Sequence, residues 1–335
     1  MMTPLQLKER LDRFPRAPLG IFPTPLQPLL RLGESIGCPE LYMKRDDLTG
    51  LGMGGNKTRS LEFLLGEALS SGADTVITSG APQSNLCCLT AAACARLGLD
   101  CILIHNSRPP ESLTGNLFLS HLSGAELRFV GEVDESHREE IVWETAGAMG
   151  ARAYAVHSGG STPRGALGYT WGAAELCEQV SRRGIELKHV VIVGAMGGTA
   201  SGFIAGNVLL GAPFLTHVIS VEYSREVLRG LLEDIVGGVL ELLGVRPSGS
   251  PFDAVEIYDE FLGDGYGAAN EATLEAARRV ARTEGIFCET VYVAKTTSGL
   301  IGLIRRGDIP SGEAVCVWHT GGHPTLFTQT HLFSG

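Results

Sequence analysis

The sequence predicts an α/β protein of two domains, each an open and mainly parallel sheet flanked by helices. Through the middle of the chain, short apolar runs alternate with longer helical patterns, which is typical of parallel strands joined by helices. Three glycine-bearing turns fall where such strands pass into helices, the usual place for ligands in these sheets. A length of 335 residues is enough for two hydrophobic cores.

The expected strands are short aliphatic runs, as in sheets that are buried on both faces. The clearest is the run from His189 to Val193. In chain order the expected strands are residues 75–78, 101–104, 127–130, 153–156, 189–193, 217–221 and 313–318.

The expected helices are longer segments in which apolar residues recur at helical spacing. A further helical pattern begins at Lys57, and a long helix follows Pro163 and ends near Arg183. The remaining expected helices are residues 84–98, 115–122, 135–149, 200–210, 226–243 and 269–283.

Composition excludes several classes of protein. The formal net charge of −10 argues against a surface for nucleic acid or anionic membranes. No apolar run reaches the length of a membrane span, and the N-terminus has no apolar signal core. The eight cysteines form no C-x-x-C pair, so the sequence predicts no metal site and indicates reduced thiols in a cytoplasmic protein.

The segment 54–59 (Gly-Gly-Asn-Lys-Thr-Arg) places Lys57 where a helical pattern begins. A lysine held there and partly desolvated can lose its proton and attack a carbonyl, forming a Schiff base. Most lysines are solvated surface charges, so this segment alone does not decide the function.

The turn 194–200 (Gly-Ala-Met-Gly-Gly-Thr-Ala) follows the clearest strand and opens a helix. Glycines allow the backbone to approach an anion, and the first N–H groups of the helix would point at it. The turn and Lys57 lie in different segments. This separation suits a small phosphorylated aldehyde cofactor that is gripped at one end and bonded at the other.

Several motifs in one order resemble a known family. The chain is similar to the pyridoxal-phosphate (PLP) enzymes that group D-cysteine desulfhydrase with 1-aminocyclopropane-1-carboxylate (ACC) deaminase, which have the tryptophan-synthase-β-like fold called fold type II. The resemblance spans nearly the whole chain. It implies a larger cofactor-binding domain of residues 1–57 and 166–335, and a smaller inserted domain of residues 58–165. The motifs are residues 44–47, 54–62, 83–85, 159–161, 165–169, 263–267, 291–292 and 319–322.

The resemblance implies a role for each matching residue on the cofactor side. Lys57 matches the lysine that bonds to the cofactor and moves protons, and Asn85 matches the asparagine beside the cofactor's 3-hydroxyl. Thr320 matches the residue near the pyridine nitrogen. A hydroxyl there hydrogen-bonds the nitrogen without forcing its protonation. The phosphate-binding turn is matched by Gly197, Gly198, Thr199 and Ala200.

On the substrate side, Gln83 and Ser84 match residues that meet the substrate carboxylate, and Asn85 is grouped with them. Ser84 is also a candidate acid, base or covalent participant. Tyr266 and Tyr292 match two active-site tyrosines, either of which could act as nucleophile or proton relay.

Each of these residues also has a plain structural interpretation. Ser84 and Asn85 are common helix caps, and Thr320 could be another. Tyr292 lies in the strand-like run 290–293, where an isolated tyrosine is more often packed in the core. His319, at the end of an apolar strand, is expected to be structural.

Two positions depart from the family pattern. The deaminases have glutamate after the second tyrosine and the desulfhydrases have threonine, whereas this chain has Val293. His323 stands where relatives often have alanine, and it could face the pocket. The active site is therefore expected to copy neither named enzyme closely.

The expected activity is α,β-elimination on a small β-substituted amino acid. The first expectation is the conversion of D-cysteine to pyruvate, ammonia and hydrogen sulfide. ACC deaminase and cysteate sulfo-lyase are the alternatives, and a protein that stores or senses PLP without turnover is the alternative from another class. The resemblance implies a homodimer.

Overall fold

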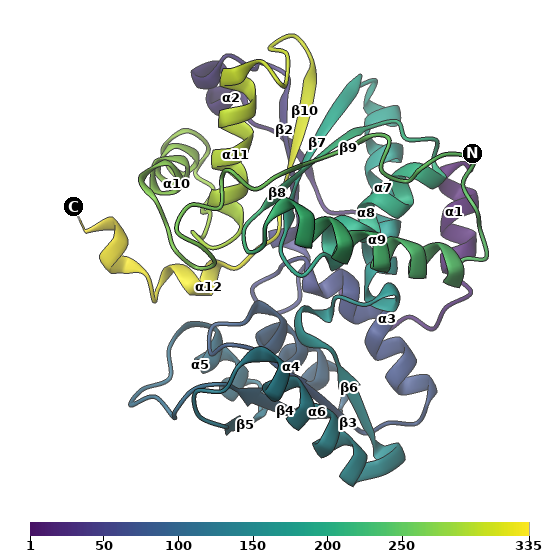
Figure 1. Cartoon of the computed structure of the whole chain (residues 1–335), viewed down its shortest axis with the longest axis vertical. Coiled ribbons are helices and arrows are strands. Elements are labelled where there is room, and N and C mark those ends of the chain that lie inside the picture. The colour runs from purple at the N-terminus through teal and green to yellow at the C-terminus, as the bar shows by residue number, and fades with distance from the viewer. Residues whose placement is uncertain (335) are drawn as a thin grey trace.

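The chain forms two separate sheets with helices on both faces of each (Figure 1). The computed structural model describes residues 1–334. Helix α3 (Lys57–Ser70) and helix α7 (Pro163–Arg183) connect the two halves and pack against each other. The larger sheet and its helices lie above the smaller one in Figure 1. This confirms the predicted fold class, while the predicted domain limits remain a prediction.

The larger sheet has the strand order β1-β2-β10-β7-β8-β9. It is parallel except for edge strand β1, which pairs antiparallel with β2. Its strands are β1 (Leu26–Pro28), β2 (Leu41–Arg45), β7 (Leu187–Gly194), β8 (Leu215–Ser220), β9 (Val255–Tyr258) and β10 (Ala314–His319).

The smaller sheet has the order β5-β4-β3-β6 and is entirely parallel. Its strands are β3 (Thr75–Ser79), β4 (Asp100–His105), β5 (Glu126–Phe129) and β6 (Ala153–Val156). Successive residues serve opposite faces of the sheet, as the pleat requires. Val76 packs with α3 and with α4 (Asn85–Leu97), whereas Ile77 packs with Val142 of α6 (Glu135–Met149).

The helices cover these faces. Helices α7, α8 and α9 share one core with the larger sheet, and α2, α10 and α11 share the other. The α-helices not yet given bounds are α1 (Pro4–Leu11), α2 (Leu30–Ile36), α5 (Gly115–Leu122), α8 (Gly198–Leu209), α9 (Arg225–Leu242), α10 (Glu271–Glu284), α11 (Val293–Arg306) and α12 (His323–Leu326). Among the described residues, none of the helices is both long and apolar enough to cross a membrane.

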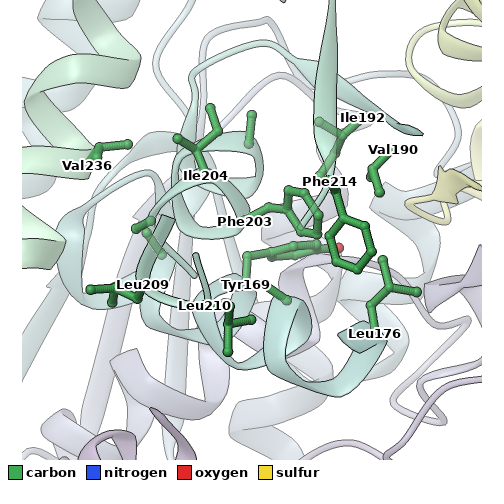
Figure 2. Close-up of a cluster of buried hydrophobic side chains, with 14 of the residues drawn as sticks. Tyr169, Leu176, Val190, Ile192, Phe203, Ile204, Leu209, Leu210, Phe214 and Val236 are labelled. Carbon is green, nitrogen blue, oxygen red and sulfur yellow. The ribbon is translucent and has the colours of Figure 1, made fainter. Parts of the chain in front are cut away.

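The main core lies between the larger sheet and α7 and α8. Figure 2 shows Phe203 and Phe214 close to Tyr169, with Ile192 of β7 beside them. The rings of Phe203 and Phe214 stack with centroids 6.2 Å apart. This core fixes the start of α8, where the turn 194–200 faces the smaller sheet.

Two expectations about elements need correction. Tyr292 is not in a strand: it immediately precedes α11, because the Glu289 carboxylate accepts the N–H groups of residues 291–293 and starts that helix. Strand β2 was not predicted, since it ends in Lys44 and Arg45. Lys44 is nevertheless fully buried, because Glu175 of α7 supplies a partner.

Candidate active site

A cavity of about 300 Å³ lies where the carboxyl ends of the two sheets face each other. Residues from both halves of the chain line the cavity. The carboxyl ends of parallel strands are the usual location for ligands in open sheets. Gln83 and Ala200 are not among the lining residues. The predicted site residues that line it are Lys57, Ser84, Asn85, Gly197, Gly198, Thr199, Tyr266, Tyr292 and Thr320.

Lys57 is the first residue of α3 and reaches into this cavity. Its Nζ donates a hydrogen bond to the carbonyl of Gly159 at 2.6 Å. Burial lowers the pKa of Lys57 to about 8, and the charge of Glu222 opposes this shift. A larger fraction of this amine is therefore neutral at physiological pH than for an exposed lysine, which suits attack on an aldehyde.

Two backbone contacts hold the Lys57 segment against the end of β10. Gly55 and Gly321 form an isolated antiparallel bridge, and the N–H of Asn56 donates to the carbonyl of Thr320 at 3.0 Å. A Cβ on Gly321 would lie 2.6 Å from the Cα of Gly55, so only glycine permits this approach. The bridge places Thr320 and Lys57 at the same cavity.

The turn before α8 has the geometry of an anion site. Gly197 has a φ of 90°, in the left-handed region that favours glycine, and α8 begins at the next residue. Asn56 Nδ2 donates to Thr199 Oγ1 at 2.9 Å, and Ser161 Oγ accepts the N–H of Gly198 at 3.3 Å. These contacts fix the start of the helix, whose N-terminal N–H groups suit a phosphate. The residues present therefore fit a phosphorylated aldehyde cofactor bonded at Lys57.

Ser84 and its neighbours form the wall opposite this turn. Ser84 caps α4 by accepting the N–H of Cys87 at 3.3 Å, and it also lines the cavity. Asn85 Oδ1 accepts from Asn116 Nδ2 at 2.7 Å, which orients the amide. Gln83 points instead to the start of α5, where its Oε1 accepts the N–H of Asn116 at 2.9 Å. The position of Gln83 in the structure gives no support to its predicted contact with the substrate, which stays a prediction.

Tyr266 and Tyr292 meet at the cavity, and their hydroxyls are hydrogen-bonded to each other. Burial raises the pKa of Tyr266 to about 12 and holds that of Tyr292 well above its usual range. Nearby Glu222 and Glu289 add to both shifts. Both phenols are therefore neutral at physiological pH and can donate protons.

Sequence reasoning missed three charged residues that line the cavity, Glu135, Arg138 and Glu222. Glu222 follows the predicted strand 217–221 directly, so its place at the carboxyl end of a strand was an available signal. Burial, and next the charge of Glu135, raise the pKa of Glu222 to about 7. Glu135 and Arg138 belong to α6, whose contact with the cavity depends on how α6 packs on the smaller sheet.

His319 and His323 lie behind the cavity wall near Asp47. His319 Nε2 donates to the carbonyl of Phe287 at 2.9 Å and its Nδ1 accepts the N–H of Gly321 at 3.1 Å, so its observed contacts are structural. His323 is not among the lining residues of the cavity, and its ring centroid lies 5.2 Å from that of His319. The three side chains have the spacing of metal ligands. However, both carboxylate oxygens of Asp47 already accept from Arg45 at 2.8 and 2.6 Å.

Comparison with known proteins agrees with this geometry. A family model described as "Pyridoxal-phosphate dependent enzyme" matches residues 17–321. The chain belongs to this family. Its cofactor is therefore pyridoxal phosphate, as the resemblance implied.

Relatives that are similar over nearly the whole chain place this PLP enzyme within the ACC deaminase group. A protein of Pyrococcus abyssi named "Putative 1-aminocyclopropane-1-carboxylate deaminase" is 40% identical over 322 residues, covering 95% of this chain and 94% of the relative. A Burkholderia vietnamiensis protein named "1-aminocyclopropane-1-carboxylate deaminase" is 36% identical over 336 residues, covering 96% and 98%. A solved structure titled as an ACC deaminase homologue has a TM-score of 0.87 at 36% identity and covers 98% of both chains.

Proposed function

We propose that this PLP enzyme deaminates a small α-amino acid and releases a 2-oxo acid and ammonia. The observation that carries the proposal is the composition of one cavity. Lys57 and the turn 197–199 line it together with Ser84, Tyr266 and Tyr292. A protein that only stored the cofactor would not need the groups on the substrate side.

The bound cofactor supplies the electron sink that makes bonds at Cα and Cβ labile. The chain supplies orientation and proton transfer. Lys57 would hold the cofactor aldehyde, and its amine would be the group that accepts a proton from the substrate. Ser84 and the first N–H groups of α4 suit the substrate carboxylate. Tyr266 and Tyr292 hold the protons that a departing or opening group needs.

ACC is the first candidate substrate. The names of the Pyrococcus and Burkholderia relatives support it better than they support D-cysteine. Opening of the three-membered ring needs a nucleophile or a proton donor at the ring carbons, and Tyr266 and Tyr292, which line the cavity, are our candidates for that role. The products would be 2-oxobutyrate and ammonia.

D-cysteine is the second candidate, and two observations favour it. Val293 is buried at the start of α11, so the carboxylate expected beside the second tyrosine of a deaminase is missing. The raised pKa values of Tyr266 and Tyr292 keep both phenols protonated at neutral pH, so neither is a ready phenolate nucleophile for ring opening. A thiolate departs from Cβ without a nucleophile, and the products would be pyruvate, ammonia and hydrogen sulfide.

The first experiment tests the cofactor bond. Purified protein with added PLP should show the visible absorbance band of lysine-bound cofactor, and Lys57→Ala should lack it. Lys295→Ala is the control, since Lys295 is buried elsewhere and donates to the carbonyls of Leu262 and Gly265. Retention of the band in Lys57→Ala would refute the assignment.

The second experiment separates the substrates. Wild-type protein is incubated with ACC and with D-cysteine, and 2-oxobutyrate and pyruvate are measured. Lys57→Ala should lower the favoured reaction by at least about 10²-fold. Formation of 2-oxobutyrate alone supports the deaminase, and formation of pyruvate alone supports the desulfhydrase. If neither substrate gives a product, both candidates are contradicted.

A separate measurement, light scattering, tests the homodimer that the resemblance implies.

A further inference from the structure

We infer that residues 158–161 form a strap that couples the two ends of the cofactor site, and that Glu139 of α6 is the positioning residue that holds this strap. Residues 159–161 are one of the motifs that carry the family resemblance, and neither candidate reaction gives them a role. The inference concerns the cofactor site. It therefore goes beyond the proposed function and does not depend on which candidate substrate is correct.

The strap contacts both anchor points of the cofactor. The Gly159 carbonyl accepts a hydrogen bond from Lys57 Nζ at 2.6 Å. Two residues later, Ser161 Oγ accepts the N–H of Gly198, the first residue of α8, at 3.3 Å. A Cβ on Gly198 would lie 2.9 Å from the Cα of Ser161, so the strap and the phosphate turn are in direct contact. A shift of the strap would therefore displace groups at the lysine and at the phosphate turn together.

The hydroxyl of Ser161 has a hydrogen that the protein does not use. A serine hydroxyl can donate one hydrogen bond and accept two. Among the described residues, Ser161 Oγ accepts from Gly198, and no acceptor is present for its own hydrogen. Ser161 lines the cavity, next to helix N–H groups that suit a phosphate. Its hydroxyl can therefore keep the bond to Gly198 and also donate to the phosphate of a bound cofactor.

Helix α6 holds the first residue of the strap from outside the cavity. Both carboxylate oxygens of Glu139 accept from the backbone N–H of Ser158 at 3.3 Å, and one of them lies 2.8 Å from His157 Nδ1. The hydroxyl of Ser158 accepts from Arg138, also of α6, at 3.0 Å. Glu139 is not among the lining residues of the cavity, so its effect on the cofactor site must pass through the strap.

The last residues of the strap lead directly into α7, which packs against them. Gly159 and Gly160 have φ values of 69° and 64°, in the left-handed region that favours glycine. A Cβ on Gly165 of α7 would lie 2.2 Å from the carbonyl oxygen of Gly160. The end of the strap near α7 is therefore fixed by packing, whereas the end at Ser158 depends on hydrogen bonds from α6.

A positioning role of Glu139 must be separated from a purely structural one. A structural role would lower the free energy of unfolding and leave the affinity of the folded protein for PLP unchanged. A positioning role would lower that affinity, and it would do so through Ser161. Growth of the visible band on titration of cofactor-free protein with PLP measures this affinity without relying on turnover.

The first test measures the contact between the strap and the phosphate. Wild-type protein and Ser161→Ala are titrated with PLP and with pyridoxal, which lacks the phosphate. Ser161→Ala should bind PLP about tenfold more weakly, as expected for loss of one hydrogen bond to a charged group, and should bind pyridoxal as tightly as wild type. Ser224→Ala is the control, because Ser224 caps α9 and is not among the residues that line the cavity.

Two outcomes of this titration would overturn the strap. One is an unchanged affinity of Ser161→Ala for PLP, and the other is an equal weakening for PLP and pyridoxal. A wild-type protein that shows no band with PLP would overturn the cofactor bond at Lys57 and the strap together. Absence of turnover in a protein that shows these binding differences would contradict the proposed function alone.

The second test is a double-mutant cycle of Glu139→Ala and Ser161→Ala. Glu139→Ala should weaken PLP binding roughly five- to tenfold, and the double variant should lose less than the product of the two single losses. Glu140→Ala is the control and should match wild type, since Glu140 is exposed and pairs with His137. Unchanged PLP affinity in Glu139→Ala, or losses that multiply, would overturn the inference. If circular dichroism shows that Glu139→Ala does not fold, Glu139→Asp replaces it in the cycle, because it keeps the charge and withdraws the carboxylate from Ser158.

Discussion

Lys57 illustrates how one residue obtains its chemistry from three parts of the chain. Its own segment starts α3, Gly159 of the smaller half accepts from its amine, and Glu222 of the larger half sets part of its pKa. Burial lowers the pKa of the amine and Glu222 raises it. The protonation of Lys57 therefore depends on the charge of Glu222, a residue that lies far from it in the sequence.

This balance predicts how the protein captures its cofactor as pH changes. Only the neutral amine attacks an aldehyde, so the rate at which cofactor-free protein binds PLP should rise about tenfold per pH unit below pH 8 and level off above it. Glu222→Gln removes the charge that raises the pKa of Lys57, so its curve should lie at lower pH. Growth of the visible band in stopped flow measures both rates. A midpoint at the pKa of an ordinary lysine, 10.5, would contradict the prediction.

At the scale of elements, helices α7 and α8 pack so closely that glycine is required between them. A Cβ on Gly202 would lie 2.1 Å from the carbonyl oxygen of Ala166 in α7. Because α8 carries the phosphate turn at its start, this close approach also sets where the turn lies. The packing of α7 against α8 therefore helps to set the geometry of the cofactor site.

Gly202→Ala should therefore lower the free energy of unfolding by about 1–3 kcal/mol through overpacking. Gly237→Ala in α9 is the matched control, because a Cβ there meets no atom within 4 Å. That change should raise the free energy of unfolding by roughly 0.5–1 kcal/mol, since alanine favours a helix interior. Urea denaturation compares the two variants, and equal shifts would contradict the packing argument.

Side chains of β7, β8 and β9 form a hydrogen-bonded chain with Glu313, which directly precedes β10. His189 Nδ1 lies 2.9 Å from His217 Nε2, and His189 Nε2 lies 2.7 Å from Glu313. His217 Nδ1 lies 3.1 Å from the hydroxyl of Tyr258. Burial lowers the pKa of His217 to about 4, so the folded protein keeps this imidazole neutral.

A histidine whose folded pKa is lowered adds stability above its unfolded pKa and loses it as pH falls. The contribution of His217 should thus be complete above pH 6.5 and lost by about pH 4. The shift corresponds to roughly 3 kcal/mol. His217→Gln should flatten this part of the curve of unfolding free energy against pH. Parallel curves for wild type and His217→Gln would show that His217 does not titrate in this window.

At the scale of the whole molecule, a buried network of charges joins elements from distant parts of the sequence. Arg59 of α3 donates to Asp46 at 2.8 Å and to Glu175 of α7 at 3.0 Å. Lys44 of β2 pairs with the same Glu175. The two cations and two anions thus balance each other's charge where the connecting helices meet the larger sheet. One of the cations, Arg59, is two residues from Lys57 in the sequence.

Arg59→Leu should lower the free energy of unfolding by about 3–5 kcal/mol, because it leaves two buried carboxylates with one cation. Arg128→Leu, in an exposed pair with Glu126, should change it by less than about 1 kcal/mol. Guanidinium denaturation of both variants measures the difference. A loss for Arg59→Leu as small as that for Arg128→Leu would show that the network adds nothing to stability.

The sequence by itself determined the α/β class, most of the strands and helices, and the cofactor. Apolar runs and glycine turns are local patterns, and each reports on the few residues around it. The motif around Lys57 and the turn 194–200 were recognisable for the same reason. Short or charged elements such as β2 were missed, because their burial depends on partners such as Glu175 that lie far along the chain.

Only the tertiary structure decided which side chains face the cavity. In the structure Gln83 contacts the start of α5 and does not line the cavity, and Tyr292 directly precedes α11. The tertiary structure also brought Glu135, Arg138 and Glu222 to the cavity. The physical reason is that the burial, the pKa and the hydrogen-bond partners of a side chain depend on contacts between elements that are far apart in the sequence. A local sequence pattern contains no information about those contacts. The substrate is selected by this same set of contacts, so the cofactor could be inferred from the sequence alone and the substrate class could not.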